Sequence, residues 1–245
     1  MLYNGEGVTS DKLEAYQYYQ KAANKGHVGA MYRYANMLYS GEGGKSDKFE
    51  AFRFYQQAGK KGHEDAMFHS GNMLYNGEGV KSDKEQACYC YKMAANKGHP
   101  DGMLNYANMC YKGDGVSMNK KEAFKYYKQA ADLYRTEAMY MCGNMLYNGE
   151  EVDTNKEKAC QYYKEAADRD HIESMFFYAN MLFRGEGISP RPAEACRYYK
   201  KAADKGHRDA MFMCGNMFEY GEGVMANKKE ASQYYKKAAD VGHVE

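Results

Sequence analysis

Asparagine recurs at one position of a long internal repeat, and its amide is the group in this chain best suited to hold another polypeptide. The copies lie 36 residues apart: Asn36, Asn72, Asn108, Asn144, Asn180 and Asn216. Asparagine is a mediocre residue inside a helix because its amide competes with backbone hydrogen bonds, so six recurrences indicate a role. A row of amides would suit the main chain of an extended segment. The alternative, which the sequence leaves open, is that each amide bonds only within the protein.

Aromatic side chains stand four residues before or three residues after most of these asparagines. This spacing places them on the same face of a helix. The rings in question are Tyr32, Phe68, Tyr140 and Phe176 before the asparagines, and Tyr39, Tyr75, Tyr111 and Tyr147 after them. Rings of this kind would cover the side chains of a segment whose main chain meets the amides. The pattern therefore predicts a peptide-binding face made of both sets.

Groups that could bind a metal or catalyse a reaction are present but poorly spaced for either task. Six histidines also recur at the 36-residue step, which separates successive copies by about a helix-pair spacing, far beyond the ~2 Å of metal coordination. The repeated Gly-Glu-Gly loops lack the Gly-Lys-Ser/Thr that completes a phosphate-binding loop. The seven cysteines fall in columns that hold aromatic or aliphatic residues elsewhere, as small buried hydrophobes do. We predict no catalytic residue, no metal and no cofactor.

The elements that must position the asparagines follow from the repeat itself. Methionines 36 residues apart, from Met31 to Met211, set a register without insertion or deletion. We predict a partial repeat at 1–27, the start of a further repeat at 244–245, and one solenoid domain over 1–245. The full repeats are 28–63, 64–99, 100–135, 136–171, 172–207 and 208–243.

Each repeat carries the signals of two helices, A and B. In repeat 64–99 the apolar spacing predicts helix A at 64–76 and helix B at 84–97. Asp83 and Gln86 form a capping box at the start of helix B, and Gly98 suits a left-handed turn at its end. One hairpin cannot bury its apolar face alone, so neighbouring hairpins must stack. The sequence thus predicts an all-α solenoid of helix-turn-helix repeats.

Composition limits the partners of such a protein. The chain has 34 Lys+Arg against 33 Asp+Glu, a balance that argues against nucleic acid as a partner. No apolar run approaches ~18 residues, so we expect no membrane insertion. The absence of a signal peptide and the unpaired framework cysteines favour a cytoplasmic location.

The repeated pattern Y-[AG]-N-M-L-Y-x-G-E-G-V, followed by D/N and then by A-A-x2-G, resembles the Sel-one-like repeat. This repeat is a relative of the tetratricopeptide repeat, and the resemblance covers nearly the whole chain. It implies a right-handed superhelix and an adaptor that binds a protein or peptide along the concave face. It also implies that the asparagine column matches the position from which tetratricopeptide repeats often bond a bound peptide's backbone. Tyr34 and Cys142 depart from the family's usual leucine, which would change packing but not topology.

Two other functions stay open. The chain begins with Met1-Leu2-Tyr3 in the register of a mid-helix, so we also consider an excerpt of a longer array or a module that stacks end to end. An enzyme is the less favoured alternative and would need its site in the irregular stretch 134–171. There, Tyr134, Glu151 and Asp170 replace turn glycines, at a cost of about 1 kcal/mol each if the turn keeps its shape.

Overall fold

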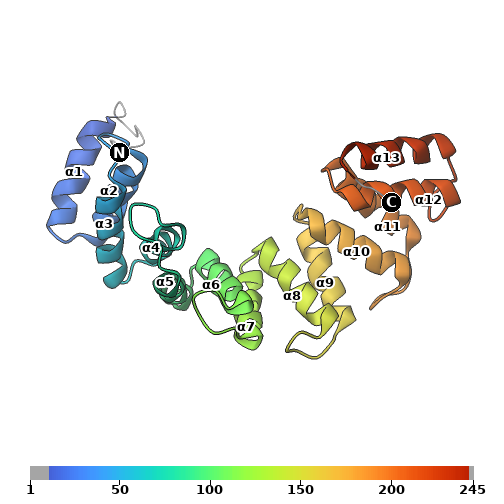
Figure 1. Ribbon diagram of the computed structural model, residues 1–245, viewed down its shortest axis with the longest axis horizontal. Coiled ribbons are helices and arrows are strands. Elements are labelled where there is room, and N and C mark those ends of the chain that lie inside the picture. The colour runs from blue at the N-terminus through green and yellow to red at the C-terminus, as the bar shows by residue number, and fades with distance from the viewer. Residues whose placement is uncertain (1–10, 243–245) are drawn as a thin grey trace. The chain divides into compact units, whose positions relative to one another are not determined.

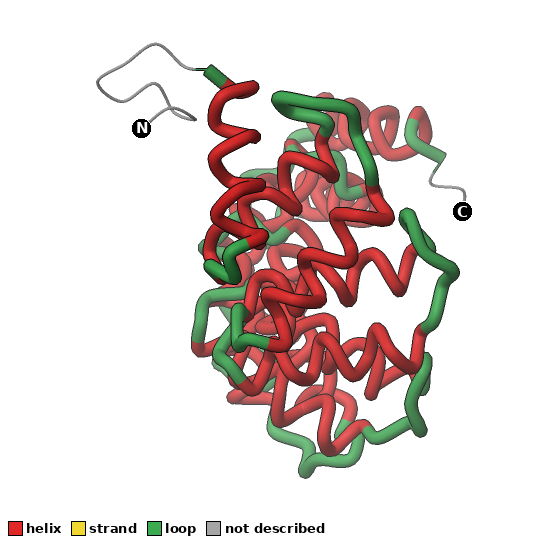
Figure 2. The backbone as a smooth tube through the Cα atoms, turned by 90° about the vertical axis from the view of Figure 1, so that its left-hand side faces the viewer, coloured by secondary structure: helices red, strands yellow, loops and turns green. Residues whose placement is uncertain are grey.

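The computed structural model describes residues 11–242, which form helices joined by short loops, with no strand in this range (Figures 1 and 2). The A helices are α2 (Val28–Ser40), α4 (Glu64–Asn76), α6 (Pro100–Lys112), α8 (Thr136–Asn148), α10 (Ile172–Arg184) and α12 (Arg208–Tyr220). The B helices are α1 (Lys12–Asn24), α3 (Lys48–Lys60), α5 (Lys84–Asn96), α7 (Lys120–Asp132), α9 (Lys156–Ala167), α11 (Pro192–Asp204) and α13 (Lys228–Asp240). The predicted all-α helical-repeat fold is confirmed.

The described chain divides into two compact units, one extending to Gln129 and the other beginning at Ala130, within α7. In each unit the main helix contacts join neighbours in sequence, so each hairpin packs on the next. The predicted helix at the very start of the chain and the further repeat at 244–245 lie outside the described residues. The single domain over 1–245 stays a prediction.

The B helices begin with the predicted side-chain caps. The Asp83 carboxylate accepts the backbone N–H of Gln86 at 2.9 Å, and Asp11, Asp47, Asn119 and Asn227 cap in the same way. The second half of the predicted capping box is wrong. The backbone N–H of Asp83 donates to the Leu74 carbonyl at 2.9 Å instead of to the side-chain oxygen of Gln86. This bond ties the start of helix B to the preceding A helix.

Five A helices begin after a histidine of the repeated column, and in four of them the imidazole acts as the cap. The Nδ1 atom of His27 accepts the backbone N–H of Ala30 at 3.1 Å, and His99, His171 and His207 accept from their own third residue in the same way. An imidazole that accepts at Nδ1 carries its proton at Nε2 when neutral. The histidines are therefore helix-start residues, as predicted, with the added role of capping.

Glycine is required where each A-to-B loop touches the preceding hairpin. The second loop glycines, such as Gly79 and Gly115, have a positive φ near 70°. A Cβ on Gly79 would lie 2.6 Å from the backbone carbon of Lys48, and one on Gly115 would lie 2.4 Å from the Lys84 carbonyl oxygen. The loop of one repeat therefore rests directly on the first turn of the previous B helix.

The core is built from the repeated methionine, alanine and tyrosine columns. Both methionine columns are buried, with Met139, Met145, Met175 and Met217 at most 1% exposed. Alanines let the helices approach closely, and tyrosines such as Tyr127 fill the space between hairpins. Six of the seven cysteines are buried free thiols, and Cys90 is partly exposed. The expected packing roles of these columns are confirmed.

The three residues that replace turn glycines keep the glycine conformation. Tyr134, Glu151 and Asp170 have φ values of 61°, 56° and 69°. The turns thus retain their shape, and each residue holds a backbone conformation that costs an L-amino acid on the order of 1 kcal/mol.

Candidate peptide-binding surface

We call the six asparagines together with their two sets of rings the A-helix surface. Each asparagine side chain is fixed by a tyrosine of the B helix in its own repeat, 19 residues further on. The tyrosine hydroxyl donates to the asparagine Oδ1 atom in every full repeat. The pairs are Tyr55–Asn36 (2.6 Å), Tyr91–Asn72 (2.8 Å), Tyr127–Asn108 (2.7 Å), Tyr163–Asn144 (2.6 Å), Tyr199–Asn180 (2.6 Å) and Tyr235–Asn216 (2.8 Å).

Burial explains why this pairing recurs. Tyr127, Tyr163 and Tyr199 are at most 1% exposed, and burial raises the pKa of the Tyr163 and Tyr199 hydroxyls well above the usual range. A buried hydroxyl without a partner would cost about 1–3 kcal/mol, so an acceptor is needed beside it. The asparagine supplies that acceptor with Oδ1 and keeps Nδ2 as its second polar group. Half of each amide thus bonds within the repeat, as the alternative interpretation expected.

The first set of rings also has a packing role. Tyr32, Phe68 and Phe176 stack on His63, His99 and His207, the histidines that begin the next repeat's A helix, with centroids 4.4–4.5 Å apart. Tyr140 makes a tilted contact with His171 at 5.1 Å. All four rings remain half-buried, so each joins two repeats and still presents part of its surface.

Three rings of the second set, Tyr39, Tyr75 and Tyr147, each lie in a three-residue contact between repeats, which we call the clamp. Tyr39 donates its hydroxyl to Glu78, the acid of the next repeat's Gly-Glu-Gly loop, at 2.5 Å. Lys48, the first residue of α3, bonds the same carboxylate oxygen at 2.8 Å and lies over the Tyr39 ring at 4.9 Å. The same arrangement recurs as Tyr75–Lys84–Asp114 and as Tyr147–Lys156–Glu186.

The clamp shifts the pKa of its acid. The ammonium of Lys48 and the hydroxyl of Tyr39 both donate to the Glu78 carboxylate, and these bonds lower its pKa from 4.5 to about 2. The pKa of Asp114 and that of Glu186 are lowered by the same kinds of partner. The acids therefore stay ionised through the whole neutral and mildly acidic range.

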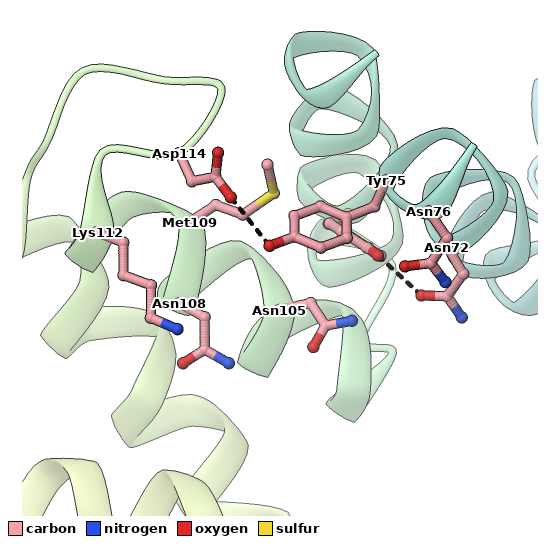
Figure 3. Close-up of a pocket in the computed structure, with 9 residues that line it drawn as sticks. Asn72, Tyr75, Asn76, Asn105, Asn108, Met109, Lys112 and Asp114 are labelled. Atoms are coloured by element: carbon pink, nitrogen blue, oxygen red, sulfur yellow. Dashed lines mark hydrogen bonds between the residues drawn. The ribbon is translucent and has the colours of Figure 1, made fainter. Parts of the chain in front are cut away.

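Two hollows on the A-helix surface lie between successive repeats of the first unit. One, of about 530 Å³, lies between α2 and α4 and is lined by Asn36 and Asn72 together with Tyr32, Tyr39 and His69. The other, of about 250 Å³, lies between α4 and α6 and is lined by Asn72 and Asn108 (Figure 3). Both include Asn72 and Asn76, so the hollows adjoin along the asparagine column.

The first unit thus brings together part of the predicted site. Asn36, Asn72 and Asn108 line hollows together with Tyr32, Tyr39 and Tyr75, whereas Phe68 and Tyr111 are not among the lining residues. The remaining predicted residues belong to the second unit. They are Asn144, Asn180, Asn216, Tyr140, Tyr147 and Phe176.

The clamp acids and lysines, which frame these hollows, were not predicted from the sequence. Their signal was available, because Lys12, Lys48, Lys84, Lys120 and Lys156 recur at the same 36-residue step as the loop acids. The two columns carry opposite charges and share one period, so a contact between them could have been predicted. The hollows also include Asn76, Asn105 and Lys112, from columns that vary between repeats.

Comparison with known proteins supports the assignment of the fold. The Sel1 repeat matches residues 1–27, 28–63, 64–99, 100–134, 136–171, 172–207 and 208–243, and the chain belongs to this family. Sel1 repeat proteins generally mediate protein–protein interactions. No curated protein matches the sequence.

Two crystal structures show the same fold. A protective antigen present in uropathogenic Escherichia coli strains, displaying an SLR fold, is 26% identical with a TM-score of 0.93. The match covers 98% of this chain and 51% of the antigen, so the chain spans about half the length of that relative. A Sel1 repeat protein from Oxalobacter formigenes is 24% identical with a TM-score of 0.72, over 86% of this chain and 84% of that one.

Three further features concern other kinds of site. Between residues 11 and 242 no three His, Cys, Asp or Glu side chains come together in a way that could hold a metal ion. No helix in the same range is long and apolar enough to span a membrane. The turns at Tyr134, Glu151 and Asp170 set the stretch 134–171 apart, and an enzymatic site there stays the less favoured alternative.

Proposed function

We propose that the A-helix surface of the first unit binds an extended segment of a partner protein, with Asn36, Asn72 and Asn108 contacting its main chain. The observation that carries this proposal is the tyrosine bond to each Oδ1 atom. With Oδ1 occupied, the amide keeps only Nδ2, which is a donor. The column is therefore a row of oriented donors, which suits the carbonyl groups of a polypeptide.

The surroundings of the asparagines support an extended ligand. The two hollows adjoin at Asn72 and Asn76, so a segment that lies along the column would meet both. Tyr32 and His69 would contact its side chains in the larger hollow, and Asn105 and Lys112 in the smaller. Because the asparagine side chains are held in place by buried tyrosines, binding would cost little additional side-chain entropy.

The sharpest test replaces asparagine by aspartate. In Asn72→Asp and Asn108→Asp, a carboxylate oxygen still accepts the tyrosine hydroxyl, but the donor is gone. We expect the double variant to fold normally and to lose the partners that the wild-type chain captures from lysate, as read by quantitative mass spectrometry. Circular dichroism and thermal unfolding would check the fold.

Asn96→Asp is the matched control. Asn96 is a B-helix asparagine that accepts the hydroxyl of Tyr126 at 3.0 Å, so this variant makes the same chemical change away from the A-helix surface. We expect it to capture the wild-type set. The proposal is contradicted if the double variant keeps every partner that Asn96→Asp keeps.

A further inference from the structure

A third hollow, of a different kind, lies on the B-helix side of the first unit, between α3 and α5. It has a volume of about 680 Å³, and its lining includes Met67, Ser70, Cys90 and Met93. None of these residues belongs to the A-helix surface. The hollow is thus a separate feature of repeat 64–99, and its origin can be traced to the sequence.

Two positions that hold aromatic rings in other repeats hold small side chains in repeat 64–99. Cys90 stands where the other full repeats have Phe54, Tyr126, Tyr162, Tyr198 and Tyr234. Ser70 stands where three other repeats have Tyr34, Tyr106 and Tyr178. Elsewhere these columns form edge-to-face pairs, such as Tyr106 with Tyr126 at 4.8 Å. Repeat 64–99 is the only full repeat that lacks a ring in both columns, so the space that a ring pair would fill is open.

The rim of the hollow is apolar at positions that are polar in every other repeat. Tyr89 is 65% exposed, and its column otherwise holds Arg53, Lys125, Gln161, Arg197 and Gln233. Met93 is half-buried, and its column otherwise holds Gln57, Gln129, Glu165, Lys201 and Lys237. Exposed apolar groups that gather around a cavity indicate a surface that another molecule covers.

The floor of the hollow also holds an unused polar group. Ser70 is 2% exposed, and its hydroxyl has no hydrogen-bond partner. A buried hydroxyl without a partner costs about 1–3 kcal/mol. A ligand that brought a hydroxyl or carbonyl into the hollow would supply that partner.

The positive charge at the edge of the hollow indicates that its ligand is acidic. Lys60, Lys61 and Lys97 line the hollow and are exposed, and none of them forms an ion pair within residues 11–242. Lys60 stands in the column of Asn96 and Asp168, which accept the hydroxyls of Tyr126 and Tyr198. The position in the preceding repeat that would accept the hydroxyl of a ring at position 90 is therefore a cation.

We propose that this hollow binds an acidic segment of a partner protein through one aromatic side chain, which takes the place of the ring missing at Cys90. The partner's ring would lie against Met67 and Met93, its hydroxyl would bond Ser70, and its carboxylates would face the three lysines. This inference does not rest on the proposed function of the A-helix surface. If both hold, one unit carries two partner sites, as an adaptor requires.

The test uses two capped peptides of glutamates, one with a central tyrosine and one with a central alanine. With [methyl-13C]methionine-labelled protein, we expect the tyrosine peptide to shift the Met67 and Met93 signals and the alanine peptide to leave them in place. Cys90 provides a second readout as the only cysteine that is not buried. Its reaction with a thiol reagent should slow when the tyrosine peptide is bound.

Cys90→Tyr is the decisive variant, because it restores the ring that neighbouring repeats carry and should therefore fold. Unchanged signals of Met31, Met37 and Met109, which are buried elsewhere in the first unit, would confirm this. We expect binding of the tyrosine peptide to weaken at least about tenfold, as loss of a buried ring contact implies. Asn72→Asp should leave this binding unchanged.

Three results would overturn the proposal. The first is an equal effect of the tyrosine and alanine peptides on Met93. The second is undiminished binding by Cys90→Tyr. The third is a Met93 signal that responds to protein concentration alone, which would identify a second copy of this chain as the occupant.

Discussion

The two inter-repeat junctions inside the second unit differ in one clear respect. Between repeats 136–171 and 172–207, Tyr147, Lys156 and Glu186 form a clamp. At the next junction the corresponding residues are Phe183, Pro192 and Glu222, so the acid has neither the hydroxyl nor the ammonium to bond. The tyrosine–asparagine bond is nevertheless present in all three repeats of the unit.

This difference shows which contacts the repeats need for packing and which they can lose. A repeat can lose the clamp and still pack on its neighbour, because the buried methionines, alanines and tyrosines carry the junction. The asparagine bond is kept even in the repeat that has lost the clamp. We conclude that the asparagine column is set by the buried tyrosine and that the clamp adds a smaller, surface contribution.

The largest effect should come from the tyrosine–asparagine bond, which every repeat of the second unit keeps. Tyr163→Phe and Tyr199→Phe each remove a buried hydroxyl from Asn144 or Asn180, and we expect each to lower the free energy of unfolding by about 1 kcal/mol. Urea unfolding followed by circular dichroism measures this. Unequal losses, with little effect beside the unclamped junction, would show that the asparagine bond is not part of a common framework.

The turns that precede α10 and α12 carry different residues at their position of positive φ, and these can be exchanged in both directions. Asp170 and Gly206 occupy equivalent positions with φ values of 69° and 95°. We expect Asp170→Gly to stabilise the protein by about 0.5–1 kcal/mol and Gly206→Asp to destabilise it by about 1 kcal/mol, because only glycine is at ease in this conformation. Thermal unfolding of the two variants tests the pair, and shifts of the same sign would contradict the account.

Neutralising the loop acid should distinguish the junctions directly. Glu186→Gln removes the carboxylate that Tyr147 and Lys156 share, and we expect a loss of about 0.5 kcal/mol, typical of a partly exposed ion pair. Glu222→Gln is the matched control and should change stability by less. Equal effects of the two variants would mean that the clamp contributes nothing.

The smallest expected effect is the pH dependence of the clamp's contribution to the free energy of unfolding. The clamp lowers the pKa of Glu186 below its value in the unfolded chain, so its stabilisation is fully present above about pH 5. It is lost as the pH falls through the lowered pKa. The stability difference between the wild type and Glu186→Gln should therefore shrink in acid, and a difference that grows on acidification would reverse the sign of the argument.

Much of this fold could be predicted because each repeat copies the same local signals. The helix starts at Asp47 and Asp83, the turn glycines and the methionine core all follow from residues that recur every 36 positions. The prediction for helix B of repeat 64–99 ended one residue late, at 97, since α5 ends at Asn96. The reach-back half of the capping box failed because the cap's N–H finds a carbonyl of the other helix first.

The site was harder to predict because its contacts join different repeats. A single helix shows that Asn72 and Tyr75 share a face, but it does not show that Asp114 bonds Tyr75 from the next loop. The hollow beside Cys90 was not predicted from the sequence, for a related reason. It arises from several small departures in columns that looked like framework, and their effect appears only when α3, α4 and α5 are packed together.

The side-chain amide signals of Asn72 and Asn108 test the central claim most directly. In a 15N-labelled sample titrated with a captured partner, the account predicts that the Nδ2 protons of both residues shift and exchange more slowly with water, while those of Asn96 do not change. Tight binding of the partner with the Asn72 and Asn108 amide signals left in place would contradict it.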